Sequence, residues 1–290
     1  MIKQNPFSFY DFLGYFIPGA VTLLLIFIFN SLDEITDFNS LLSVLTNNEE
    51  FKIDKFMFFI IVSYSLGHFI NYLSSFTIEK YSYWRYDYPA KYLLKIGHDC
   101  DYFGNYKENE KTRIRYSIAL FVLPIFILDE VFKLYTYFRR ELDDLLITAV
   151  KQKTLILLNN LQIIEGDDFE ILKKSDFQRI ISHYAYENSK NHSSKLSNYV
   201  ALFGFLRCMC FISVLSFWIY VYYLIINIFS YFNTSDAFRL NDISISKVII
   251  LLVILCVCYI YFMAFIKFYR RYTLETYMII AIDKDLVEEV

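Results

Sequence analysis

Residues 12–29 are FLGYFIPGAVTLLLIFIF, an uncharged run of 18 residues that contains Pro18 and Gly19. At about 1.5 Å per residue, a helix of this length can cross the roughly 30 Å hydrocarbon core of a membrane. A helix that began at Pro18 would keep only about 12 residues before Asn30, which is too short to cross. We therefore expect the helix to pass through Pro18 and Gly19 with a kink, or an interfacial piece from about Ser8 to bend there into the span.

Three further uncharged runs are long enough to span a membrane, and they lie at 56–78, 208–235 and 248–266. A fifth run, 116–128, has only 13 residues and contains Pro124, so we expect it to be buried or to lie at the membrane surface. The 290 residues are 56% hydrophobic, with 7 glycines and 4 prolines, which is typical of an apolar, helix-rich chain. The sequence therefore predicts an all-α polytopic membrane protein with four transmembrane helices and a helical cytoplasmic domain inserted between spans two and three.

Lys and Arg are unevenly distributed between the spans. Segment 79–207 holds nineteen of the 28, the N-terminal stub holds one and the C-terminal tail four, whereas loops 30–55 and 236–247 hold two each. Because cytoplasmic loops carry an excess of Lys and Arg, both termini are predicted to be cytoplasmic, and the first span to be an uncleaved signal anchor. The expected domains are transmembrane helices 1 and 2 with a short acidic external loop at 1–78, the cytoplasmic helical domain at 79–200, transmembrane helices 3 and 4 at 201–270, and a cytoplasmic tail at 271–290.

The cytoplasmic segment has helical punctuation. Pro89 suits the first turn of a short helix that Gly97 would end. Apolar residues recur at helical spacing within 139–165, which predicts an amphipathic helix. The sequence SDFQ at 175–178 has the form of a capping box and should start the next helix. A longer helix is expected to begin near Lys195 and to run into the third span.

One stripe of the second span carries small and polar residues at spacings of three and four, namely Ser63, Gly67, Asn71 and Ser74 or Ser75. Small residues let helices approach closely in a bilayer, and polar ones hydrogen-bond across the contact, so the stripe indicates helix packing. The alternative is a polar pore or gate lining that includes His68, because ionisable groups inside a membrane are costly and often functional. Glu79 ends this span and Arg207 begins the third, and we predict an ion pair between them.

Nine residues are candidates for a gate or a packing contact near the cytoplasmic boundary, namely Pro18, Gly19, Gly67, His68, Asn71, Ser74, Glu79, Gly204 and Arg207. Two interpretations are open. The kink at Pro18 and Gly19 is a hinge on which the cytoplasmic domain could pull, or it is a packing kink matched by small residues on a neighbouring helix.

Enzyme motifs are scarce. The sequence has no phosphate-binding glycine loop, no Gly-x-Ser-x-Gly turn and no His-Glu-x-x-His, so no catalytic residue is assigned. Arg179 and His183 in RIISH are similar to the Arg-to-His pair of HEPN ribonucleases, but three residues separate them where that family has four to six. Nuclease activity is therefore the third hypothesis, with Arg179, His183 and His192 as the residues to test. The net charge of −3 gives no indication of nucleic-acid binding.

Metal and cofactor sites are not expected either. The sequence HDCD at 98–101 could bind a metal, but alternating residues in a polar loop are more typical of a solvated segment. The pairs CMC at 208–210 and CVC at 256–258 place thiols two residues apart, about 200° around a helix, which favours packing over metal binding. The four spans contain no Asp, Glu, Lys or Arg, so a pore would require an oligomer.

Three blocks carry a resemblance to a known group: GYFIPGA at 14–20, GHFINYLSSFTIE at 67–79 followed by YPAKYLL at 88–94, and LFGFLR at 202–207. Together they resemble a loosely defined group of uncharacterised bacterial four-span membrane proteins, some of which are encoded in anti-phage defence loci. The group often has an Arg-Asn pair where this chain has Arg207 and Cys208.

The resemblance implies an effector or accessory protein that damages or depolarises the bacterial inner membrane when infection is sensed. We expect such a protein to lie in the lipid bilayer as a homo-oligomer with a cytoplasmic protein partner. We expect neither an enzymatic activity nor a cofactor. The alternative is a non-toxic membrane anchor or scaffold that holds a cytoplasmic partner at the bilayer.

Overall fold

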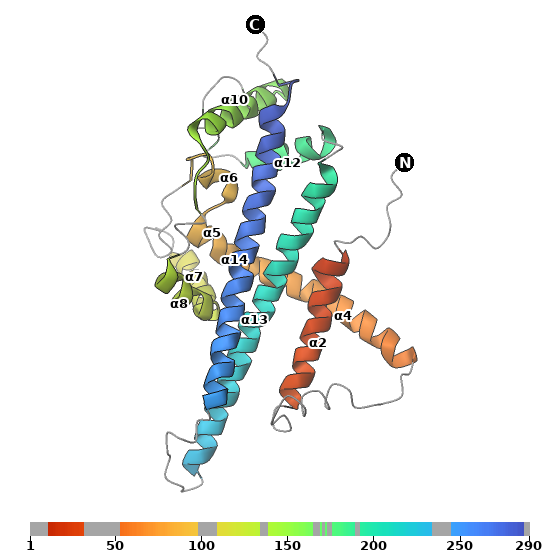
Figure 1. The fold of residues 1–290 in the computed structure, drawn as a ribbon, viewed down its shortest axis with the longest axis vertical. Helices are drawn as coiled ribbons and strands as arrows, with labels where there is room; N and C mark the ends of the chain where they lie inside the picture. Colours follow the sequence, from red (N-terminus) through yellow and green to blue (C-terminus); the bar gives the residue numbers. More distant parts are fainter. Residues whose placement is uncertain are drawn as a thin grey trace. The chain divides into compact units, whose positions relative to one another are not determined.

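The computed structural model describes residues 11–31, 53–97, 109–133, 139–164, 176–188, 192–233 and 245–286, together with 169 and 172. Every regular element in these ranges is helical (Figure 1). The elements are the π-helical turn η1 Phe12–Phe16, α2 Ile17–Asn30, α4 Ile53–Ser74, the π-helical turn η2 Ser75–Glu79, α5 Lys80–Tyr86, α6 Pro89–Tyr92, α7 Asn109–Phe121, α8 Leu123–Phe132, α10 Asp144–Asn160, α12 Phe177–Asn188, α13 Ser193–Asn233 and α14 Ile245–Ile282. The all-α prediction is confirmed.

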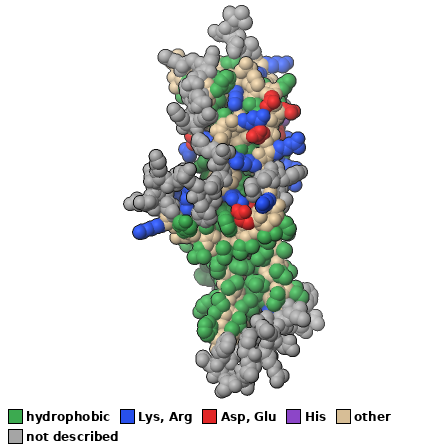
Figure 2. Space-filling model, turned by 90° about the vertical axis from the view of Figure 1, so that its left-hand side faces the viewer, with side chains coloured by type: hydrophobic (Ala, Val, Ile, Leu, Met, Phe, Trp, Pro, Cys, Tyr) green, Lys and Arg blue, Asp and Glu red, His purple; other side chains and the backbone are tan. Residues whose placement is uncertain are grey.

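Four helices are long and apolar enough to cross a membrane: Phe12–Asn30, Phe56–Tyr92, Ser193–Phe229 and Ser246–Ile282. The run 116–128 is not among them, and it is divided between α7 and α8, which meet at Val122. On the face drawn in Figure 2, hydrophobic side chains form a broad band with few charges, while Lys, Arg, Asp and Glu gather elsewhere on the described surface. The chain is a multi-pass membrane protein, as predicted.

The residues fall into two compact units. The first unit consists of Met1–Ile78, Val122–Ile125 and Gly204–Phe262, and the second consists of Glu79–Phe121, Phe126–Phe203 and Met263–Val290. Helices α13 and α14 contribute to both units, because the division falls inside each of them. Residues 271–290, expected as a tail, belong to the second unit, and α14 itself continues to Ile282.

The lengths of α13 and α14 exceed what a membrane requires. They contain 41 and 38 residues, which correspond to about 62 and 57 Å at 1.5 Å per residue. A hydrocarbon core is about 30 Å thick, so roughly half of each helix lies outside it. Helix α13 begins at Ser193 and runs without interruption into the third span, as the sequence predicts.

The core of the second unit is built from α6, α10, α12 and α14. It includes Leu158 of α10, Phe177 and Ile181 of α12, and Tyr277 and Ile280 of α14, all of them buried. The Tyr277 hydroxyl donates a hydrogen bond to the backbone oxygen of Ala90 at 2.6 Å, which joins α14 to α6. Of the apolar pattern predicted within 139–165, Val150, Leu157 and Leu158 are buried, whereas Leu145 and Leu161 are exposed.

The predicted bounds of two helices in this unit differ in part from the observed ones. Pro89 starts α6, as expected, but the helix ends at Tyr92, before Gly97. The chain reverses at Lys95, which has a positive φ of 56° and takes the left-handed conformation that Gly97 was expected to supply. Helix α12 begins at Phe177, within the predicted capping box, whereas Ser175 lies outside the described residues.

In the first unit, α2 and α4 are in backbone contact through two glycines. A Cβ atom added at Gly19 would overlap the carbonyl oxygen of Ser63, and one added at Gly67 would overlap the carbonyl oxygen of Tyr15. Only residues without a side chain allow helices to approach so closely, which is a common packing device in membranes. This contact pairs the first two spans.

Pro18 is accommodated inside a continuous helix. The turn before it is widened, and the N–H of Ile17 bonds to the carbonyl of Phe12, five residues back. This π-helical turn lies where Pro18 has no N–H to donate. The Thr22 hydroxyl donates to the Pro18 carbonyl at 2.8 Å. The described helix passes through Pro18 without interruption, whereas Ser8 lies outside the described residues, so the predicted kink stays a prediction.

The glycine contact predicts different effects for three equivalent substitutions. Gly19→Ala and Gly67→Ala should each destabilise the protein by about 1–3 kcal/mol, because the methyl group meets backbone that can move only if α2 and α4 separate. Gly204→Ala is the matched control, since a Cβ there meets no atom within 4 Å and Ala favours a helix by about 1 kcal/mol. Thermal unfolding of the detergent-solubilised protein measures all three. Equal unfolding temperatures for Gly19→Ala and Gly204→Ala would contradict the contact.

Candidate functional site

A polar cluster lies within the first unit, and we call Asn71, Ser74, Arg207 and Cys208 the Arg207 cluster. Arg207 of α13 donates from Nη2 to Asn71 Oδ1 at 2.6 Å and from Nε to Ser74 Oγ at 3.2 Å. Both acceptors belong to α4. The cluster therefore links the third span to the second.

The neighbouring thiol extends the cluster to the first span. Cys208 Sγ lies 3.6 Å from Ser74 Oγ and 3.6 Å from Asn71 Oδ1. It is also a weak donor to the carbonyl oxygen of Gly14, at 3.9 Å, in the widened turn η1. Residues from three spans thus converge on one polar position in an otherwise apolar bundle.

The arginine makes this position energetically unusual. A charged side chain at the centre of a membrane helix costs about 2.5–3.5 kcal/mol on insertion scales, and less toward the interface. Asn71 and Ser74 satisfy guanidinium donors but are neutral, so they do not cancel the positive charge of Arg207. Glu79, its expected ionic partner, belongs to the second unit and accepts a hydrogen bond from Tyr83. The pairing of Glu79 with Arg207 stays a prediction.

The remaining candidates of the first unit differ in their surroundings. His68 stacks on Tyr15, with ring centroids 3.9 Å apart, and meets the edge of Tyr64 at 4.6 Å. Its side chain is exposed on the surface of the single chain rather than enclosed. Gly204 is buried, but no close neighbour explains the absence of a side chain there. Gly19 and Gly67 form the close contact between the first two spans, and Pro18 is buried beside Gly19 in α2.

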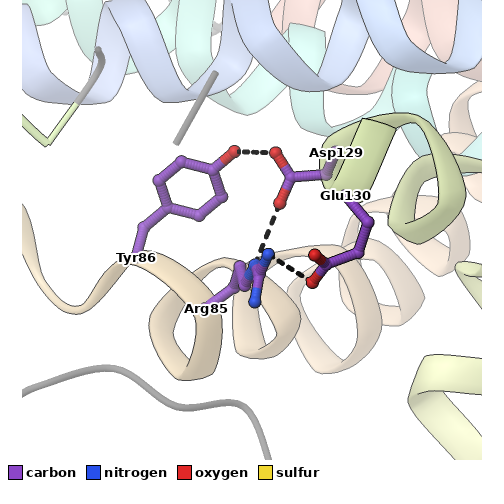
Figure 3. A network of polar contacts seen from close by, with 4 residues as sticks. All are labelled: Arg85, Tyr86, Asp129 and Glu130. Atoms are coloured by element: carbon purple, nitrogen blue, oxygen red, sulfur yellow. Dashed lines mark hydrogen bonds and ion pairs between the residues drawn. The ribbon is translucent and has the colours of Figure 1, made fainter. Parts of the chain in front are cut away.

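A second polar group in the second unit consists of Arg85, Tyr86, Asp129 and Glu130, and we call it the Asp129 network (Figure 3). Arg85 Nε lies 3.0 Å from Asp129 Oδ2, and Arg85 Nη2 lies 2.6 Å from Glu130 Oε1. The Tyr86 hydroxyl donates to Asp129 Oδ1 at 2.6 Å. The network holds α8 against α5 by charge and hydrogen bonding.

The Asp129 side chain is fully buried, and its burial raises the pKa of the carboxyl above the ordinary value of 3.8. Hydrogen bonds from Tyr86 and Arg85 act in the opposite direction, but burial has the larger effect. In the sequence, Asp129 directly follows the apolar run 116–128. An acidic residue that directly follows an apolar run is the signal that could have indicated a buried, paired carboxylate.

The residues of the nuclease hypothesis have separate surroundings. Arg179 of α12 pairs with Asp176 at 3.1 Å, and His183 is exposed. His192 Nδ1 lies 3.0 Å from Glu275 Oε1 of α14, and Lys195 donates to the same carboxylate at 2.7 Å. This arrangement ties the start of α13 to α14, which is a structural role.

Among the residues that the structure describes, no group of three or more His, Cys, Asp or Glu is placed to hold a metal ion. The HDCD segment at 98–101 lies outside the described residues. Of the described cysteines, Cys208, Cys210 and Cys258 are buried and Cys256 is exposed, all as free thiols. Cys210 Sγ contacts the carbonyl oxygen of Cys258 at 3.8 Å, a packing contact between α13 and α14.

No family model, curated protein or solved structure matches this chain.

The raised pKa of Asp129 predicts a pH-dependent stability difference between the wild-type protein and Asp129→Asn. The folded state keeps the Asp129 proton at pH values where the unfolded chain has lost it, so the free energy of unfolding should fall as the pH rises from 3.8 through the folded pKa. Each unit of pKa elevation corresponds to about 1.4 kcal/mol. Because Asn does not titrate, the free energy of unfolding of the wild-type protein minus that of Asp129→Asn should decrease over this pH range. Unfolding experiments at a series of pH values measure this difference.

The other carboxylates titrate in both proteins, so their contributions cancel in this difference. A difference that grows with pH would show instead that pairing with Arg85 lowers the pKa of Asp129 more than burial raises it.

Proposed function

We propose that this protein is a bacterial inner-membrane effector, or accessory protein, of an anti-phage defence system. It perturbs or depolarises the membrane in response to a cytoplasmic signal or partner. The observation that carries this proposal is the Arg207 cluster, a charged and hydrogen-bonded position where three spans meet near the predicted cytoplasmic boundary. Groups of this kind are costly in a membrane and mark functional positions.

The course of α13 supports a link between a cytoplasmic signal and the bundle. The helix begins at Ser193 in the second unit and continues unbroken into the first unit, which it enters at Gly204. Arg207 lies three residues after this point. A rotation or a shift of α13 along its axis would therefore move Arg207 relative to Asn71 and Ser74. Hydrogen bonds from the charged Arg207 guanidinium contribute about 1.5–3 kcal/mol each, which the binding of a partner can overcome.

Orientation and assembly follow from charge and exposure. The topology that places 24 of the 28 Lys and Arg residues inside puts both termini in the cytoplasm. Within the described part of α4, Phe58 and Tyr72 remain 67% and 68% exposed in the single chain. A path for ions would need several copies, so the proposed active form is a homo-oligomer with a cytoplasmic protein partner.

Inducible expression with a membrane-potential dye tests the proposal. Wild-type protein should slow growth and depolarise the membrane, and Arg207→Gln should do so at a lower expression level, because α13 is no longer held to α4. Arg113→Gln is the matched control, since Arg113 is an exposed residue of α7. Quantification of each variant in the membrane fraction corrects for insertion.

Two outcomes would contradict the proposal. Harmless wild-type expression at high level, with full membrane potential, would favour the anchor or scaffold. Depolarisation that is the same for Arg207→Gln and Arg113→Gln at matched membrane levels would remove the Arg207 cluster from the mechanism.

A further inference from the structure

The second unit contains a pocket of about 530 Å³, which we call the tyrosine pocket. Residues of η2, α5, α6, α12 and α14 line it, and those that matter here are Glu79, Tyr83, Tyr88, Lys91, Gln178 and Arg179. Its volume is within the range of about 300–1,000 Å³ that small-molecule sites occupy. The function proposed above does not account for it.

Gln178 is the feature that points to a ligand. Its amide Oε1 and Nε2 are both buried, and neither has a hydrogen-bond partner among the described residues. Buried polar atoms are almost always paired, so an unpaired amide on the wall of a pocket indicates a missing partner. A capping-box bond to the N–H of Ser175 would use Oε1 alone and would still leave the Nε2 donor unpaired.

The aromatic wall offers a stacking surface. The rings of Tyr83 and Tyr88 stack with centroids 3.9 Å apart, so one face of Tyr88 is covered. Tyr88 lines the pocket and is 43% exposed, which leaves its other face open to a planar group. The Tyr83 hydroxyl donates to Glu79 and lies 3.4 Å from the Tyr269 hydroxyl, which fixes Tyr83 behind it.

Two cationic side chains line the same pocket. Lys91 comes from α6 and Arg179 from α12, and the Arg179 side chain is 85% exposed. Arg179 uses Nε to pair with Asp176 at 3.1 Å, which leaves its terminal N–H groups to bind an oxyanion. The pocket thus combines an amide, an aromatic face and cations that suit a phosphate.

We propose that the tyrosine pocket binds an adenine nucleotide. The Gln178 amide offers one donor and one acceptor side by side, which match the N7 acceptor and the N6 donor of adenine. The base stacks on the open face of Tyr88, and the phosphate meets Lys91 and Arg179. Guanine presents two acceptors, O6 and N7, at the same edge and would leave Oε1 facing an acceptor.

Isothermal titration of the purified full-length protein in detergent tests this proposal without reference to membrane depolarisation. AMP should bind saturably and at least tenfold more tightly than GMP, with adenosine weaker than AMP. Gln178→Leu should weaken AMP binding at least tenfold. Gln152→Leu, the same change at an exposed position of α10, should leave AMP binding unchanged.

Arg179→Ala provides a second variant at an exposed position, where misfolding is not a concern. It should weaken the binding of AMP at least fivefold and leave that of adenosine unchanged, whereas Arg113→Ala should affect neither. The proposal would be overturned by the absence of saturable AMP binding, by equal affinities for AMP and GMP, or by unchanged AMP affinity in Gln178→Leu. Binding of glycerol 3-phosphate as tight as that of AMP would also overturn it and would identify a lipid-headgroup site. If AMP binds but expression is harmless, the effector function fails and the pocket assignment stands.

Discussion

The lengths of α13 and α14 constrain the rest of the structure. Inside a bilayer the backbone must satisfy its own hydrogen bonds, so each span has to be helical over about 30 Å. These two helices are about twice that long and unbroken, and nothing in their backbone marks the point where lipid ends. Only the side chains change along each helix, and they decide which part of it suits lipid and which part suits the protein core.

Helix α14 shows this change clearly. Its uncharged segment 248–266 leaves residues such as Val253 and Ile260 exposed, as lipid requires. Arg270 and Arg271 follow, and Arg270 donates to the carbonyl of Arg140 at 2.8 Å. The apolar residues after them do not face lipid, because Tyr277 and Ile280 are buried in the protein core of the second unit. One helix is thus apolar for two different reasons.

The sequence predicts the spans well because insertion into lipid depends on the composition of each segment alone. The same reasoning assigns 271–290 to a tail, because charged residues interrupt the run and do not reveal the core that Tyr277 joins. Contacts between residues far apart in the sequence are harder to predict. Arg207 and Ser74 are 133 residues apart. The sequence suggests Glu79, an opposite charge, as the partner of Arg207, whereas the observed acceptors Asn71 and Ser74 are neutral and carry no charge signal.

The glycine contact and the hydrogen bonds of Arg207 in the first unit differ in how easily they can rearrange. At Gly19 and Gly67 backbone meets backbone, and any shift there separates α2 from α4. Arg207 is instead held to α4 by side-chain hydrogen bonds from a charged guanidinium, each of which is worth about 1.5–3 kcal/mol and can be exchanged for another. Movement is therefore easier between α13 and the α2–α4 pair than at the glycine contact between α2 and α4. By this argument the first two spans form the fixed part of the bundle and α13, which continues into the second unit, the adjustable part.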